Sequence, residues 1–454
     1  MLLLNGMLLT LGEEGRVIPD AALLIKENHI VDLGTSFELK RKYPAEEVMD
    51  AGGKLIMPGL ICAHTHFYGA FARGMALPGE PPANFPQILE RLWWSLDKVL
   101  RPDDIRYSAL VCLVDAIRHG TTALIDHHAS PRAVDGSLDI IAEAVQEAGL
   151  RACLCYEVSD RDGEEIAGAG IQENIRFIRK IQAPTIEHPS ARHKITEPHL
   201  LAATMGLHAS LTLSDETLGW AAEEAAKLGV GFHIHVAEDK ADVKDSLKKS
   251  GLRVVERLQK LGILGPKTIA AHCVHIDAYE MEILHETGTR VVHNPRSNMN
   301  NAVGVADVPG MLRRGIEVGL GNDGFSNNMF TEMHTAYLLH KLEKKDPRVM
   351  GADQVLKMAF KNNARTAELF FPGPLGELSV GAPADIILVD YHPPTPLTEG
   401  NFPWHIIFGV DGTEVDTTIV AGKVLMQAKK LNTLDEEEIC ARARELAARL
   451  WRRL

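Results

Sequence analysis

His64 and His66 end an apolar run of the chain and are the residues best suited to metal chemistry. On a β-strand, residues i and i+2 point to the same face, so both imidazoles can bind one metal ion. A buried strand favours such a role, because polar groups removed from water need new partners. A solvated loop can also hold a histidine pair. Other motifs in the chain are needed to distinguish a metal site from such a loop.

Three further polar motifs follow apolar runs of their own: residues 233–238 (HIHVAE), 271–273 (AHC) and 321–324 (GNDG). A catalytic zinc or iron site takes about three or four protein ligands and leaves a position open for water. His64, His66, His235 and Asp323 can supply three imidazoles and one carboxylate. Asp323 could be an ordinary turn aspartate, but its place directly after a strand-like run favours a ligand. We predict one divalent metal ion here, zinc first and iron as the alternative.

Glu238 and His272 are the predicted proton-transfer groups. His233 and His235 share one strand face, and the spacing favours His235 as the ligand. Glu238 then follows the strand end, where a carboxylate can reach a metal-bound water without binding the ion. The alternative for Glu238 is a solvated charge in an acidic stretch. His272 ends the next strand and could orient the water, and Asp323 could accept a hydrogen bond from it.

Five side chains are candidates for substrate contact: His208, Arg73, Phe67, His127 and His128. His208, His127 and His128 end predicted strands, where barrel enzymes build their sites. His208 could instead make a structural hydrogen bond, and His127 and His128 could support the metal ligands. Arg73 could bind a carbonyl or an anionic group, with a surface ion pair as the alternative. Phe67 could stack on a planar ring.

Residues 73–91 are rich in proline and glycine and follow the first metal-binding strand, so we expect that the segment 67–91 covers the site as a lid. Trp93 and Trp94 could stack on a ring, but their spacing favours the core. Residues 157–203 are expected to contain a helix and a long surface loop.

Eight apolar, strand-like runs alternate with amphipathic helical stretches: residues 60–63, 123–126, 152–156, 204–208, 231–235, 268–271, 290–292 and 317–321. Eight such units close a TIM-type (β/α)8 barrel, and an open doubly wound α/β sheet is the alternative. Polar, metal-binding residues recur at the carboxyl ends of the first, fifth, sixth and eighth runs. Those ends meet on one face of a barrel, so we predict a barrel over residues 57–374.

Short strand patterns fill both ends of the chain, at residues 1–56 and 375–454. Because chain termini tend to lie close together, we predict that the two ends form one small β-sandwich. The second segment ends in an amphipathic helix over residues 434–454.

The composition restricts the range of partners. The 454-residue chain has a formal net charge of −13, which disfavours nucleic acid and anionic membranes as partners. It shows no signal peptide and no run long enough to span a bilayer. The six cysteines lie mostly in apolar runs, typical of reduced core thiols. We expect a cytoplasmic protein that binds a small molecule.

The ordered motifs resemble those of the amidohydrolase superfamily, in its branch of cytosine, guanine and adenosyl-nucleoside deaminases and triazine hydrolases. Beyond the motifs above, the resemblance rests on four stretches: residues 57–59 (MPG), 294–298 (NPRSN), 323–328 (DGFSNN) and 376–385 (GELSVGAPAD). It covers nearly the whole chain. Residues 126–131 (DHHASP) and 297–301 (SNMNN) are similar to the SsnA-type aminohydrolases, whose gene is associated with selenium-dependent purine and xanthine metabolism.

This resemblance implies one zinc or iron ion bound by His64, His66, His235 and Asp323. It also implies that Glu238 and His272 are catalytic, and that the chain forms a homo-oligomer, a dimer or larger. Relatives with two metal ions need a carboxylated lysine on a middle strand, and residues 152–156 and 204–208 contain no lysine.

We therefore predict a hydrolytic deaminase of an aromatic N-heterocycle, purine- or pterin-like. Two alternatives remain at this point: a hydrolase that expels chloride or an alkylamine from a triazine-like ring, and a non-catalytic scaffold on the same fold. Leu207 and Asn300 replace a proline and a lysine that are common in deaminase relatives, which leaves the substrate open.

Overall fold

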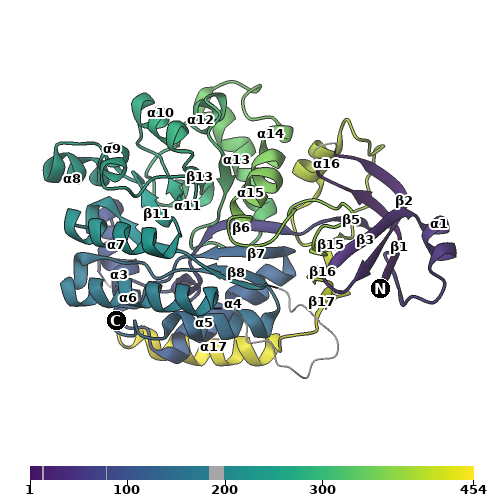
Figure 1. Ribbon diagram of the computed structural model, residues 1–454, viewed down its shortest axis with the longest axis horizontal. Coiled ribbons are helices and arrows are strands. Elements are labelled where there is room, and N and C mark those ends of the chain that lie inside the picture. The colour runs from purple at the N-terminus through teal and green to yellow at the C-terminus, as the bar shows by residue number, and fades with distance from the viewer. Residues whose placement is uncertain (13–14, 78, 184–198) are drawn as a thin grey trace.

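The computed structural model describes residues 1–12, 15–77, 79–183 and 199–454 and consists of a barrel joined to a sheet (Figure 1). The barrel strands are β6 (Leu60–Thr65), β7 (Thr121–Asp126), β8 (Arg151–Leu154), β9 (Leu201–Ala203), β10 (Met205–Ala209), β11 (Phe232–Val236), β12 (Ile269–His272), β13 (Arg290–His293) and β14 (Val318–Leu320). The eight predicted runs match β6, β7, β8 and β10 to β14 within two residues at each end. The short strand β9, directly before β10, was not predicted.

Parallel pairing closes these strands into a barrel. Strands β6 to β9 form one ladder and β10 to β14 a second. A parallel bridge between Thr65 and Asp323 joins β6 to the residues after β14, and the His66 amide donates to the Asp323 carbonyl oxygen at 3.0 Å. On the other side a bridge links Val158 to Leu207. The barrel is confirmed, and Asp323 lies at its seam.

Helices surround the barrel: α4 (Pro102–Arg118), α5 (Ser137–Ala148), α6 (Glu164–Gln182), α7 (Asp215–Leu228), α8 (Lys240–Ser250), α9 (Val254–Lys260), α10 (Ala278–Thr287), α11 (Pro295–Asn300), α12 (Val308–Arg313), α13 (Met329–Lys344), α14 (Ala352–Leu356) and α15 (Asn363–Ala367). The C-terminal helix α17 (Glu436–Trp451), yellow in Figure 1, lies beside α4. Arg118 forms an ion pair with Glu436, and Trp451 Nε1 donates to the Phe71 carbonyl oxygen at 2.8 Å. The terminal helix thus anchors the segment that follows β6.

The two ends of the chain form the sheet at the right of Figure 1. Its strands are β1 (Leu2–Leu9), β2 (Val17–Lys26), β3 (His29–Thr35), β4 (Val48–Asp50), β5 (Leu55–Pro58), β15 (Ile386–Val389), β16 (Val415–Val420), β17 (Lys423–Gln427) and β18 (Lys430–Leu431); α1 (Ser36–Lys42) and α16 (Phe402–Gly409) flank them. In the described residues hydrogen bonds join all nine strands into one mixed sheet, and the small β-sandwich stays a prediction. Side chains such as Leu23, Ile56 and Ile386 share one buried cluster, which the sheet encloses.

The chain passes from this sheet into the barrel at Gly59, between β5 and β6. The pairing of β5 with β15 confirms that the two ends fold together, while the domain limits 1–56, 57–374 and 375–454 stay a prediction. In the described part of the chain, no helix has both the length and the apolar character needed to cross a membrane.

Short helices follow β6 over the carboxyl ends of the strands: η1 (Phe67–Ala72), α2 (Phe85–Ile88), the π-helix η2 (Leu89–Trp93) and α3 (Trp94–Lys98). The lid predicted at 67–91 includes residue 78, which lies outside the described residues. Most of the long loop predicted within 157–203 falls on residues 184–198, which also lie outside them, and α6 is its expected helix.

Candidate metal centre and active site

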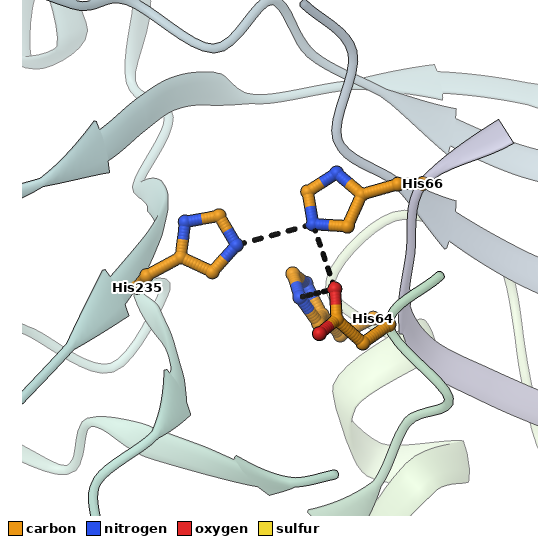
Figure 2. A group of neighbouring side chains, drawn as sticks. His64, His66 and His235 are labelled. Atoms are coloured by element: carbon orange, nitrogen blue, oxygen red, sulfur yellow. Dashed lines mark hydrogen bonds and ion pairs between the residues drawn. The ribbon is translucent and has the colours of Figure 1, made fainter. Parts of the chain in front are cut away.

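Four side chains converge at the carboxyl face of the barrel. Figure 2 shows His64 and His66 at the end of β6, with His235 of β11 facing His66. His66 Nε2 lies 3.1 Å from His235 Nε2 and 3.1 Å from Asp323 Oδ1. His64 Nε2 lies 3.7 Å from the same carboxylate oxygen, and one donor atom from each residue falls within 4.8 Å of the others. The structure thus brings together the four predicted ligands.

The hydrogen bonds of the far ring nitrogens show that this donor set fits a cation. His66 Nδ1 lies 2.6 Å from the His127 carbonyl oxygen, and His235 Nδ1 lies 2.8 Å from that of His208. Because a carbonyl only accepts, each Nδ1 carries the proton and each Nε2 presents a lone pair. Two lone pairs 3.1 Å apart repel unless a cation lies between them. His64 Nε2 is buried and has no hydrogen-bond partner in the described residues. Three imidazoles and one carboxylate suit zinc.

The charge balance favours the same conclusion. Burial alone would lower the pKa of His66, but the hydrogen bond and charge of Asp323 raise it to about 9, so a positive charge at His66 Nε2, from a proton or a metal ion, is favoured. Burial likewise opposes ionisation of Asp323, yet the neighbouring imidazoles of His64 and His66 hold its pKa well below the usual range. The site therefore stabilises a positive charge beside an ionised carboxylate, and a divalent cation supplies that charge.

The backbone at the site is strained. Ala237, His272 and Asp323 adopt positive φ angles of 45°, 72° and 57°, a region that residues other than glycine rarely occupy. Such strain persists where the surrounding fold enforces it, and it clusters at functional sites. Here it occurs directly after β11, at the last residue of β12 and in the turn that follows β14.

Helix α11 holds the predicted proton-transfer groups. His272 Nδ1 lies 2.8 Å from Asn298 Oδ1, so the ring keeps its proton on Nδ1 and presents Nε2 as an acceptor. That Nε2 has no hydrogen-bond partner in the described residues and lies 3.5 Å from Glu238 Oε2. Asn301 Nδ2 donates to Glu238 Oε1 at 3.4 Å, and the Ser297 hydroxyl donates to Asp323. Burial raises the pKa of Glu238 to about 7. Glu238 can therefore gain or lose a proton near pH 7, while the neighbouring Asp323 stays ionised.

A family model for amidohydrolases matches residues 55–425. The chain belongs to the amidohydrolase family. The chain is 34% identical over 454 residues to a 5′-deoxyadenosine deaminase of Methanosarcina mazei, covering 99% of this chain and 98% of that protein. It is 36% identical over 433 residues to a 5-methylthioadenosine/S-adenosylhomocysteine deaminase of Moorella thermoacetica, covering 94% of each.

Solved structures show the same fold as this amidohydrolase. An adenosine deaminase from Xanthomonas campestris with bound zinc has a TM-score of 0.85 at 22% identity, covering 99% of this chain and 98% of the other. Atrazine chlorohydrolase from Arthrobacter aurescens, in complex with zinc, has a TM-score of 0.82 at 22% identity, covering 98% and 99%. The predicted family, barrel fold and enzyme class are confirmed.

The amidohydrolase has a cavity beside the four candidate metal ligands, and both aromatic and polar side chains line it. The aromatic and apolar wall is formed by Tyr68, Phe85, Leu89, Trp93 and Trp94. Polar side chains of the lining include Glu157, His208, Glu238 and Asn301, and Ala209 and Leu211 add apolar surface. Trp93 and Trp94 were expected in the core. The π-helix that ends at Trp93 shifts the helical register, so that two neighbouring tryptophans both reach the cavity.

The predicted substrate contacts divide between the cavity and the core. His208 lines the cavity. Phe67 does not: it is 1% exposed in the core, because the chain enters η1 directly after His66 and turns the ring inward. Its amide donates to Asp126 Oδ1 at 2.8 Å. Arg73 is exposed and is not among the described residues that line the cavity.

His127 and His128 are also buried and lie beside the cavity, outside its lining. His127 accepts the His66 ring proton with its carbonyl oxygen, and His128 Nε2 pairs with Ser130 Oγ at 2.9 Å. Their placement matches the alternative of support for the metal ligands.

Two site features were missed in the sequence. Glu157 lies directly after a predicted strand, a position that points to the active face of a barrel, but the acidic loop that follows obscured it. Asn298 lies in the NPRSN motif, yet its contact with His272 depends on how α11 packs against β12.

Proposed function

We propose that this amidohydrolase deaminates an adenosine derivative altered at its 5′ position, with one zinc ion per chain. The predicted class, a metal-dependent hydrolytic deaminase of a purine-like ring, is confirmed by the relatives, which are named as 5′-deoxyadenosine and 5-methylthioadenosine/S-adenosylhomocysteine deaminases. The observation that carries the proposal is the convergence of His64, His66, His235 and Asp323 beside Glu238 and His272. The zinc in two structural neighbours supports the choice of metal.

When bound, the zinc ion supplies Lewis acidity and lowers the pKa of a water molecule toward about 7. His64, His66, His235 and Asp323 would hold it. The remaining chemistry is assigned to the protein side chains.

His272 and Asp323 orient the attacking water, because His272 Nε2 and the Asp323 carboxylate both accept hydrogen bonds. Glu238, with a pKa of about 7, takes a proton from the water and delivers it to a ring nitrogen. The water oxygen bonds to the carbon that carries the amino group. The second water proton passes by way of the Asp323 carboxylate to the amino group, the carbon–nitrogen bond breaks, and ammonia leaves. The product carries a carbonyl oxygen in place of the amino group.

The aromatic wall fits a planar substrate. Tyr68, Trp93 and Trp94 provide flat apolar surfaces beside the metal ligands, and aromatic rings pack well against a heterocycle. The polar side chains of the same lining can form hydrogen bonds with the edge of such a ring.

Ammonia release tests the proposal. Zinc-loaded protein is assayed with 5′-deoxyadenosine, methylthioadenosine, S-adenosylhomocysteine, guanine, a pterin and an amino-triazine, with chelated protein and Glu238→Gln as controls. The proposal expects zinc-dependent ammonia from the adenosine derivatives. Release of chloride or an alkylamine from triazines without ammonia from any purine would support the alternative hydrolase.

We further propose that the protein is cytoplasmic and forms a homo-oligomer, a dimer or larger. The cysteines are all free and five of the six are buried, as expected for a reducing compartment. Leu338 and Leu342 on α13 and Phe408 on α16 are 61%, 77% and 69% exposed, which supports a subunit contact. Sedimentation of the wild type and of Phe408→Glu tests this, with a shift to monomer expected for the variant.

A further inference from the structure

Glu157 is a buried carboxylate in the cavity to which the mechanism gives no task. It follows β8, is 5% exposed and lines the same cavity as Glu238, which follows β11. Its Oε2 has no hydrogen-bond partner among the described residues. A buried carboxylate oxygen without a donor is costly, so a ligand that brings a donor is favoured there.

Arg161 and His66 are partly engaged elsewhere, and Arg161 Nη1 has no hydrogen-bond partner in the described residues. Arg161 forms ion pairs with Asp97 and Asp162, and its guanidinium lies over the Trp94 ring at 5.3 Å. His66 donates its Nδ1 proton to the His127 carbonyl oxygen, so it offers none to Glu157. His127 Nδ1 lies 3.4 Å from Glu157 Oε2, yet neither atom has a hydrogen-bond partner in the described residues. Glu157 lines the cavity and therefore keeps acceptor capacity that these neighbours do not fill.

His208 presents a second acceptor beside it. The Thr212 hydroxyl donates to the Ala209 carbonyl oxygen at 3.2 Å, and His208 Nδ1 lies 2.5 Å from the same hydroxyl oxygen. Since that hydroxyl proton is used, His208 donates from Nδ1 and its Nε2 carries a lone pair. This Nε2 lies 3.5 Å from Glu157 Oε1. Two acceptors thus face each other across a short gap in the cavity wall.

We propose that Glu157, together with His208, selects substrates that present hydrogen-bond donors at this wall. The donors would be the vicinal hydroxyls of a sugar or an N–H of the ring itself. The inference rests on the proposed function and names what the substrate must carry besides its amino group. A substrate without these donors leaves both acceptors buried and unpaired, and sites of that kind reject such analogues strongly.

The test pairs one substitution with matched substrates. Glu157→Gln keeps the size of the side chain and removes its charge. The sugar hydroxyls are probed with 5′-deoxyadenosine against 2′,3′,5′-trideoxyadenosine, and the ring N–H with adenine against 9-methyladenine. We expect kcat/KM for the donor-bearing member of one pair to fall about 10- to 100-fold, mainly through KM, as for loss of a hydrogen bond to a charged group. The donor-free member should change less than about 2-fold.

Glu173→Gln is the matched control. Glu173 is also buried, but on α6, where it accepts from the amides of Gly136 and Leu138. It should lower the melting temperature without changing the substrate ratios. An equal loss for all four compounds in Glu157→Gln, or a loss of zinc, would assign Glu157 a structural role and overturn the inference. No loss for any compound would overturn it as well.

Calorimetric binding separates this inference from the proposed reaction. If the wild type releases ammonia from none of the compounds, the proposed function fails. Selective weakening of binding of the donor-bearing compounds to Glu157→Gln would still support the specificity role, and unchanged binding would refute it.

Discussion

Replacing Glu238 by glutamine should lower the catalytic rate and raise the stability of the fold at alkaline pH. Glutamine keeps the shape of the side chain but cannot carry a proton from water to a ring nitrogen. General acid–base help is typically worth about 10²–10⁴ in rate, so kcat should fall by that factor. Zinc content should not change, because Glu238 is not among the four residues whose donor atoms converge.

The same change should stabilise the fold at alkaline pH. Burial raises the pKa of Glu238 from 4.5 to about 7, so the folded state holds its proton more tightly than the unfolded chain does. Stability contributed by this group therefore falls as pH rises from about 4.5 through about 7. The loss above pH 7 is on the order of 3 kcal/mol. Glutamine has no charge to bury and avoids this loss.

Scanning calorimetry of chelated protein at pH 5 and pH 8 measures the stability effect, and ammonia release by zinc-loaded protein measures the rate. For a chain of this length the gain at pH 8 corresponds to roughly 3 °C in melting temperature, with little difference at pH 5. The exposed Glu90→Gln serves as a control for both assays. Wild-type turnover in Glu238→Gln would refute its role in proton transfer, and a lower melting temperature at pH 8 would refute the burial argument.

Further outcomes follow from individual contacts. Asp323→Asn should lower zinc content per chain, measured by elemental analysis, since it removes the one carboxylate ligand; full occupancy would contradict its assignment. Asn298→Leu should reduce kcat about 10- to 100-fold with zinc retained, because His272 loses the acceptor that fixes its ring proton. The kcat/KM profile should rise with pH through about 7, since Glu238 accepts a proton only when ionised, and a flat profile would exclude it as the base. Arg257 is 1% exposed and donates to the carbonyl oxygens of Ser210 and Leu213. Arg257→Leu should therefore lower the unfolding free energy, measured by urea denaturation, by roughly 2 kcal/mol. An unchanged midpoint would show that these bonds contribute nothing to stability.

The sequence was sufficient to bring the four proposed metal ligands together, because strand periodicity determines where they lie. His64 and His66 share a face at the end of β6, and parallel strands bring His235 and Asp323 to the same edge of the barrel. Spacing within a strand is a local property, so it can be read without knowing the packing. Glu238 followed from the same reasoning.

The cavity wall could not be derived in this way. Trp93 lines the cavity at the end of the π-helix η2, and Phe67 packs into the core at the start of the 3-10 helix η1. Neither kind of helix has a clear sequence signal. The position of Asn298 beside His272 depends on the packing of α11. At the chain ends the strands were predictable, but their joining into one continuous sheet depends on the pairing of β5 with β1 and β15.

A zinc titration of the chelated protein tests the central claim most directly. Ammonia release from 5′-deoxyadenosine is followed while zinc is added and bound metal is counted. The account predicts that activity rises linearly to one zinc ion per chain and then stays constant. Activity that needs no metal, or that continues to rise to a second equivalent, would contradict a single metal centre built from His64, His66, His235 and Asp323.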